Sequence, residues 1–199
     1  MKVKRIITDN LESNCYIIYN EGNSEAIVID PGETDIKKLG TFLKDNKINV
    51  EMVLLTHEHF DHIMGCNKLK KLYNYKLICS NECALNIVDS KKNLSFYYYN
   101  ENPYNNFLPD MTYENINFKL IWNGLSIIIY RTPGHSAGSV CIQIGDIFFT
   151  GDTMLKDTST VTKLPGGNKD KLKQSILFLK SIIIGKQIYP GHGECFSIK

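Results

Sequence analysis

All five histidines of this 199-residue chain lie in three short stretches, and each stretch follows a run of apolar, strand-like residues. The stretches are 56–62 (THEHFDH), 132–135 (TPGH) and 189–193 (YPGHG). A fourth stretch, 148–153 (FFTGDT), has the same arrangement with a carboxylate in place of the histidine. Histidines that only pack a core would not all follow strands with turn residues beside them. The pattern therefore predicts one polar site at several strand ends, built from imidazoles and carboxylates that zinc and similar ions prefer.

Seven side chains in these stretches are candidate metal ligands: His57, His59, Asp61, His62, His135, Asp152 and His192. Seven ligands are too many for one tetrahedral centre, so we expect two ions. Alternate side chains of an extended segment point to the same side, and His57 and His59 can therefore share one ion. Asp61 and His62 can turn toward the other ion. By the same alternation Glu58 should point away from both, and we assign it no catalytic role.

The elements that position these residues follow from hydrophobic periodicity. Apolar and β-branched runs predict strands at 3–8, 15–19, 26–29, 52–55, 76–79, 117–122, 125–131, 140–144, 147–150 and 187–189. Apolar residues three and four apart predict helices at 35–47, 64–72, 82–88 and 169–183. Both halves of the chain thus run from a strand meander to a helix and a strand, which predicts two sheets covered by helices.

The segment 89–113 is rich in Asn and Tyr and has no sustained period, so we expect a long loop there. Its aromatic part, 96–104, could cover the site and stack against a substrate. It could equally fill a small satellite core or a dimer interface. Four lysines are candidate anion contacts, although solvated surface positions are the simpler interpretation for each: Lys91, Lys92, Lys156 and Lys163.

The composition favours one globular domain spanning residues 1–199, because 43% of residues are hydrophobic and 22% are charged. The 23 basic and 21 acidic residues give a balance that does not indicate a nucleic-acid partner. No apolar run approaches the roughly 20 residues that span a bilayer, and the N-terminus does not resemble a signal peptide. We therefore expect a cytoplasmic protein without a membrane partner, with its six cysteines reduced. The sequence does not indicate an oligomeric state.

The stretch 56–62 resembles the His-x-His-x-Asp-His signature of the metallo-β-lactamase superfamily. The later histidine and aspartate motifs occur in the family's order, and residues 14–16 and 29–32 resemble its opening strands, so the resemblance spans nearly the whole chain. It implies an α/β (α+β) fold, a four-layer αβ/βα sandwich of two mixed β-sheets flanked by helices, with the site between the sheet edges. It also implies a first metal on His57, His59 and His135, a second on Asp61, His62 and His192, and Asp152 as the bridge.

Two divalent ions, zinc with iron or manganese as alternatives, would lower the pKa of a shared water. The bridging hydroxide would be the nucleophile, and Asp61 would act as a catalytic residue that orients it. The metals would stabilise the negative charge that develops on the attacked carbonyl oxygen.

The compact size and the LPGG segment at 164–167 are similar to small glyoxalase II-like (hydroxyacylglutathione hydrolase-like) enzymes. That resemblance implies hydrolysis of a small-molecule thioester or ester. The chain departs from the full glyoxalase II pattern because no helical region follows His192, and Gly193-Glu194 replaces the usual Glu-Tyr. The sequence therefore does not indicate whether glutathione is used. The alternatives are a mononuclear-iron persulfide (sulfur) dioxygenase and, less favoured, a non-catalytic metal-binding interaction protein.

Overall fold

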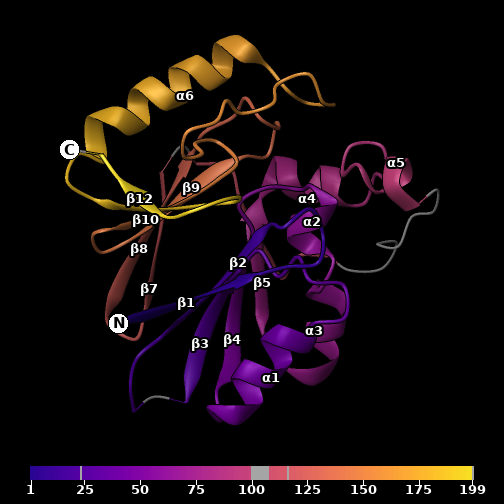
Figure 1. Ribbon diagram of the computed structural model, residues 1–199, viewed down its shortest axis with the longest axis vertical. Helices are drawn as coiled ribbons and strands as arrows, with labels where there is room; N and C mark the ends of the chain where they lie inside the picture. Colours follow the sequence, from indigo (N-terminus) through magenta and orange to yellow (C-terminus); the bar gives the residue numbers. More distant parts are fainter. Residues whose placement is uncertain (23, 100–107, 116, 199) are drawn as a thin grey trace.

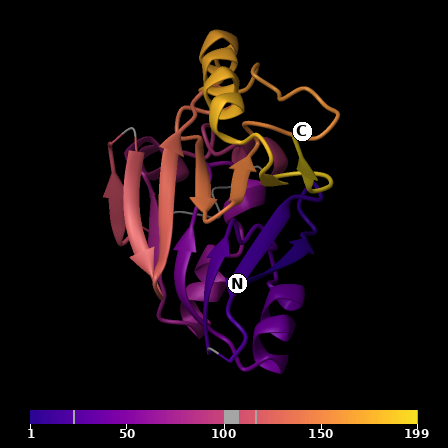
Figure 2. The same ribbon diagram turned by 90° about the vertical axis from the view of Figure 1, so that its left-hand side faces the viewer.

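Two six-stranded sheets form the centre of the protein, whose computed structural model describes residues 1–22, 24–99, 108–115 and 117–198. The first sheet contains, in spatial order, β1 (Lys2–Ile7), β2 (Asn14–Tyr19), β3 (Glu25–Ile29), β4 (Asn49–Leu54), β5 (Lys76–Ser80) and β6 (Met111–Tyr113). The second contains, in spatial order, β12 (Phe196–Ser197), β11 (Gln187–Pro190), β10 (Ile147–Gly151), β9 (Val140–Ile144), β8 (Leu125–Arg131) and β7 (Asn117–Trp122). Both sheets are mixed, since β3 to β6 pair in parallel, as do β10 and β11, and the other pairs are antiparallel. Figure 2 shows the second sheet running across the molecule from the salmon strands β7 and β8 to the yellow strands β11 and β12.

Helices cover the outer faces of the two sheets. They are α1 (Lys37–Asp45), α2 (Phe60–Ile63), α3 (Cys66–Leu72), α4 (Asn81–Ile87), α5 (Ser95–Tyr99) and α6 (Lys169–Ile182). In Figure 1, α6 lies at the top and α1 and α3 at the bottom, with the sheets between them. The predicted four-layer sandwich of two mixed sheets flanked by helices is therefore confirmed.

Three hydrophobic clusters alternate with these four layers. The first contains Leu39 and Leu69 and joins α1 and α3 to the first sheet. The second lies between the sheets, and the third contains Leu179 and Phe148, which join α6 to the second sheet. In β3, Val28 belongs to the first cluster and Ile27 to the second, so both faces of the strand are buried. Burial on both faces explains why this strand is a continuous apolar run in the sequence.

The predicted strands and long helices all occur, with ends within three residues of the expected ones. The short elements α2 and β12 were not predicted, because two to four residues cannot show a period. The sequence predicts that cysteines stay reduced, and all six have free thiols. No helix among the described residues is long and apolar enough to cross a membrane.

The prediction of one long loop at 89–113 is wrong, because this segment contains a short helix and a short strand. Residues 95–99 form α5, where Asn93 Oδ1 accepts a hydrogen bond from Ser95 N at 2.8 Å. Asn93 is itself held by its side-chain amide, which donates to the Ile87 carbonyl at 2.7 Å. Residues 111–113 form β6, which pairs with β5 over three residues. Both elements depend on contacts with other segments, which periodicity cannot reveal. Residues 100–107 of the predicted loop lie outside the described residues.

Candidate metal centre

Four strands from both sheets end at the candidate site. β4 leads through the extended residues 55–59 into α2, and the loop between β8 and β9 supplies His135. β10 ends directly before Asp152, and β11 ends two residues before His192. A hydrogen bond of 2.8 Å from Val140 N to the Thr56 carbonyl joins the first of these loops to the second sheet. The ligand loops are thus fixed to one another by backbone contacts.

The first group of ligand atoms comes from three buried histidines, His57, His59 and His135, whose candidate atoms lie within 4.8 Å of one another. His59 Nδ1 lies 2.9 Å from His135 Nε2. His135 Nδ1 lies 2.9 Å from the Val161 carbonyl, which can only accept, so Nδ1 carries the hydrogen. The remaining nitrogen of His135 therefore presents a lone pair toward His59. This is the arrangement that a metal ligand requires.

The second group comes from Asp61, His62 and His192, whose candidate atoms also lie within 4.8 Å of one another. Asp61 Oδ2 lies 3.1 Å from His192 Nε2 and 3.4 Å from His62 Nε2. The other nitrogen of His192 donates to the Leu11 carbonyl at 3.1 Å, which leaves Nε2 free to face Asp61. The α2 turn thus directs both of its ligand candidates to one point.

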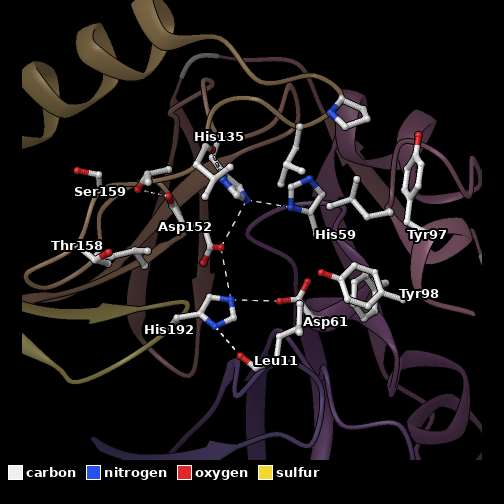
Figure 3. Close-up of a pocket in the computed structure, with 17 residues that line it drawn as sticks. Leu11, His59, Asp61, Tyr97, Tyr98, His135, Asp152, Thr158, Ser159 and His192 are labelled. Atoms are coloured by element: carbon white, nitrogen blue, oxygen red, sulfur yellow. Dashed lines mark hydrogen bonds and ion pairs between the residues drawn. The ribbon is translucent and has the colours of Figure 1, made fainter.

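The Asp152 carboxylate lies between the two groups (Figure 3). Its Oδ2 is 3.5 Å from His135 Nε2 and 3.5 Å from His192 Nε2, while Oδ1 is 3.7 Å from His62 Nε2. A side chain at Gly191 would place its Cβ 2.1 Å from Asp152 Oδ1, so only glycine fits there. The structure therefore brings all seven predicted site residues together, with Asp152 where a bridging ligand would stand.

A buried carboxylate outside the ligand set, Asp30, holds two of the histidines. Its Oδ1 accepts from Thr56 N at 2.8 Å, and its Oδ2 accepts from Thr56 Oγ1 at 2.6 Å and from His62 Nδ1 at 3.0 Å. Since the Thr56 hydroxyl donates to Asp30, it accepts from His57 Nδ1, 3.0 Å away. Asp30 thus holds the hydrogen of each neutral imidazole on Nδ1, which leaves Nε2 as the nitrogen that can bind a metal. The sequence interpretation included Asp30 only as part of an opening motif and missed this role.

Unpartnered buried atoms indicate that a metal fits this arrangement. Within the described part of the chain, four side-chain atoms here are buried without a hydrogen-bond partner: His57 Nε2, His59 Nε2, His62 Nε2 and Asp152 Oδ1. Each such atom costs about 1–3 kcal/mol when it stays unsatisfied. Nitrogen and carboxylate oxygen are ligands of divalent metals, and bound cations would satisfy His57 Nε2, His62 Nε2 and Asp152 Oδ1. His59 faces His135 through Nδ1 instead.

The electrostatics differ between the two groups. Burial lowers the pKa of His57 and His59 well below the usual value, and neighbouring imidazoles lower it further, so both stay neutral as ligands must. In the second group burial by itself would lower the pKa of His62. The nearby carboxylates of Asp61 and Asp30 have a larger effect, and the pKa of His62 is raised. In the same way His62 and His192 outweigh burial and lower the pKa of Asp61, which keeps this carboxylate ionised.

Glu58 points away from the site, as its place between two ligands predicts. Asn86 Nδ2 donates to its Oε1 at 2.9 Å and Ser136 Oγ donates to its Oε2 at 2.8 Å. Burial raises the pKa of this carboxyl group above its usual value. Glu58 therefore ties the first ligand loop to α4 and to the loop that carries His135.

A cavity of about 690 Å³ opens over both groups and exposes five of the seven candidate ligands to a substrate. Tyr97 and Tyr98 form one side, and Thr158 and Ser159 form the opposite side (Figure 3). The Tyr98 ring packs on Phe60, with centroids 4.5 Å apart. By its sequence, the aromatic stretch 96–104 could either cover the site or fill a satellite core or dimer interface. The position of α5 beside the cavity agrees with a cover for the site. Residues 100–104 lie outside the described part. The four lysines considered as anion contacts are not among the described residues that line the cavity.

The model of the metallo-beta-lactamase superfamily matches residues 8–192. The chain belongs to this superfamily. It is 32% identical over 194 residues to the probable metallo-hydrolase MJ0888 of Methanocaldococcus jannaschii, covering 92% of this chain and 88% of the relative. It is 28% identical over 179 residues to the probable polyketide biosynthesis zinc-dependent hydrolase PksB of Bacillus subtilis, covering 89% of this chain and 72% of the relative. It is also 28% identical over 195 residues to the hydroxyacylglutathione hydrolase of Francisella tularensis subsp. novicida, covering 96% and 68%.

Solved structures of the superfamily share the fold over almost the whole chain. The BLEG-1 B3 metallo-beta-lactamase superposes with a TM-score of 0.90 at 26% identity, covering 98% of this chain and 94% of the other. The di-iron-bound form of TTHA1623 superposes with a TM-score of 0.81 at 23% identity, with the same coverage of 98% and 94%. The family match and the named relatives indicate a metal-dependent hydrolase of this superfamily, and the candidate ligand groups support binding of divalent metal.

Proposed function

We propose that this protein hydrolyses a small thioester or ester with two divalent metal ions, preferably zinc, in the manner of the glyoxalase II-like enzymes. The observation that carries the proposal is the pair of buried ligand groups that share Asp152 beneath an open pocket. A mononuclear site would require only one group, yet the candidate atoms of the second group also lie within 4.8 Å of one another. A pocket over the site favours an enzyme over a non-catalytic metal-binding protein.

Each group of residues has a role in this reaction. Bound to the two histidine and aspartate groups, the cations would lower the pKa of a shared water and stabilise negative charge on the carbonyl oxygen. Asp61, whose pKa is lowered by His62 and His192, is an ionised acceptor at neutral pH and orients the attacking water through its carboxylate. Asp30 and the Leu11 and Val161 carbonyls hold the hydrogen of each neutral ring on Nδ1, so that Nε2 is the nitrogen presented to a metal. The pocket walls position the acyl group and exclude bulk water.

The names of two relatives support this proposal. One is called a zinc-dependent hydrolase of polyketide biosynthesis and another a hydroxyacylglutathione hydrolase. Both are 28% identical to this chain, so they support the class of reaction more strongly than a particular substrate.

The test is metal analysis combined with a substrate panel. The protein loaded with zinc, manganese or iron is assayed on thioesters, lactones, phosphodiesters and β-lactams, and the ions per chain are counted by atomic emission. Two ions and thioester hydrolysis are expected. One iron per chain with oxygen uptake on a persulfide would replace the proposal with the dioxygenase alternative. Bound metal without turnover on any substrate would favour a metal-binding interaction protein.

A further inference from the structure

The mouth of the pocket exposes large apolar side chains. Leu11 is 50% exposed, Tyr97 62%, Tyr98 56% and Val161 53%. They come from three segments far apart in the sequence, and all four line the same cavity. Exposed apolar patches of this kind, rimmed by polar groups, mark ligand-binding sites because a ligand would remove their surface from water.

Among the described residues, the lining of the same cavity contains neither lysine nor arginine. Lys91, which is near the cavity in sequence, has its Nζ 5.7 Å from the centre of the Phe96 ring. The segment 100–107, whose structure is not described, also contains no lysine or arginine in its sequence.

The apolar wall is also held in place rather than left free to move. Tyr98 packs on Phe60, whose backbone N–H donates to the Asn93 carbonyl at 2.8 Å. The Tyr99 hydroxyl, one residue further on, donates to Asn10 Oδ1 at 2.8 Å. Phe60 directly precedes Asp61, so the ring on which Tyr98 packs is next to the candidate catalytic residue in the chain. A fixed apolar wall beside the reacting centre is a means of selecting substrates.

We propose that this pocket selects uncharged substrates with an apolar acyl group, and that Tyr97 and Tyr98 determine this preference. The inference rests on the proposed function and adds the substrate class to it. Substrates with an anionic acyl or thiol portion, such as a glutathione thioester, would place a carboxylate against apolar walls without a protein cation to pair with it. Burial of an unpaired charge is costly, whereas each buried methylene group is favourable.

Two thioethers that cannot be hydrolysed test the preference without requiring turnover. The neutral probe is S-hexyl-2-mercaptoethanol, and the anionic probe is S-hexyl-2-mercaptoethanesulfonate, whose sulfonate is a weak metal ligand. Titration calorimetry on the metal-loaded protein should give a Kd at least about tenfold lower for the neutral probe, since it avoids the unpaired charge. Shortening the alkyl chain from hexyl to ethyl should weaken binding about threefold for each methylene group removed.

Tyr97→Lys places a cation at the pocket mouth and should reverse the preference toward the sulfonate. The matched control is Ile121→Lys, which adds the same charge at a 77% exposed position on β7, outside the pocket, and should keep the wild-type preference. Equal or tighter binding of the sulfonate by the wild type, no chain-length effect, or no response to Tyr97→Lys would each overturn the inference. Hydrolysis of the matching thioesters is measured separately. Selective binding without hydrolysis would reject the proposed function alone, and hydrolysis without selectivity would reject only the inference.

Discussion

Replacing Asp30 with asparagine tests whether a carboxylate outside the ligand set controls metal affinity. The substitution keeps the shape of the side chain and removes its charge. In the wild type three donors converge on this carboxylate: Thr56 N at 2.8 Å, Thr56 Oγ1 at 2.6 Å and His62 Nδ1 at 3.0 Å. An amide has one accepting oxygen and an NH₂ group that only donates, so it cannot accept from all three.

Either orientation of the new amide carries a cost. With its NH₂ group toward Thr56 N, two buried donors face each other, which costs about 1–3 kcal/mol. With its NH₂ group toward His62, Nδ1 of that ring must accept, and the hydrogen moves to Nε2, the atom that should face a metal. The Thr56 hydroxyl then accepts from the amide and donates to His57 Nδ1, so His57 Nε2 also becomes protonated. One substitution thus perturbs a ligand in each of the two groups.

The expected effect is a large loss of metal affinity. Removing the outer partner of one metal-bound histidine costs about 10–100-fold in affinity. Since two histidines change here, we expect a loss near the upper end, about 100-fold or 2.7 kcal/mol. Competition with a zinc-binding chromophore measures this affinity, and atomic emission after dialysis counts the ions that remain. Thermal unfolding followed by circular dichroism checks that the fold is intact.

Glu58→Gln is the matched control, because it also removes a buried carboxylate beside the ligands. Its amide oxygen can still accept from Asn86 Nδ2, and its NH₂ group can donate to Ser136 Oγ, which in turn can donate to Ser139 Oγ at 2.9 Å. We therefore expect wild-type metal affinity. Undiminished affinity in Asp30→Asn would refute the role given to Asp30. Equal losses in both variants would mean that the hydrogen-bond pattern is not the cause.

Three further predictions follow from the site. Asp152→Ala should lose metal and hydrolysis together, because its carboxylate contacts both groups, and full retained activity would reject the bridging role. Gly191→Ala should weaken metal binding at least about tenfold, because the new Cβ would lie 2.1 Å from Asp152 Oδ1, whereas Gly40→Ala, with nothing within 4 Å, should not. Burial raises the pKa of Glu58 above its ordinary value of 4.5. The folded protein is therefore most stable with respect to this group below pH 4.5, where Glu58 is protonated in both the folded and the unfolded state. This contribution to the free energy of unfolding is lost as the pH rises through the raised pKa. Glu58→Gln should therefore gain stability relative to the wild type between pH 4.5 and neutral pH in urea unfolding, and a pH-independent difference would contradict this.

The sequence could predict the candidate ligands because each has a local signal. A histidine or aspartate follows an apolar strand and stands beside a glycine, proline or threonine, as in 132–135 and 189–193. The strands themselves are recognisable because both faces are buried, which makes them continuous apolar runs. The pocket wall lacked such a signal. Tyr97 and Tyr98 lie in a five-residue helix that depends on Asn93, so their place over the site follows from contacts rather than from a period.

The protonation pattern of the ligands could not be predicted, because most of their outer partners are distant in sequence and two of them are backbone carbonyls. His192 pairs with a carbonyl 181 residues away, and His135 with one 26 residues away. Every residue type has a carbonyl, so no residue type signals these contacts. The sequence therefore specifies which side chains can bind a metal, whereas the fold specifies which ring nitrogen each one presents. A substitution that moves the backbone at Leu11 or Val161 would break the hydrogen bond that fixes the tautomer of His192 or His135. Metal binding would then weaken, although every ligand in the motif stays in place.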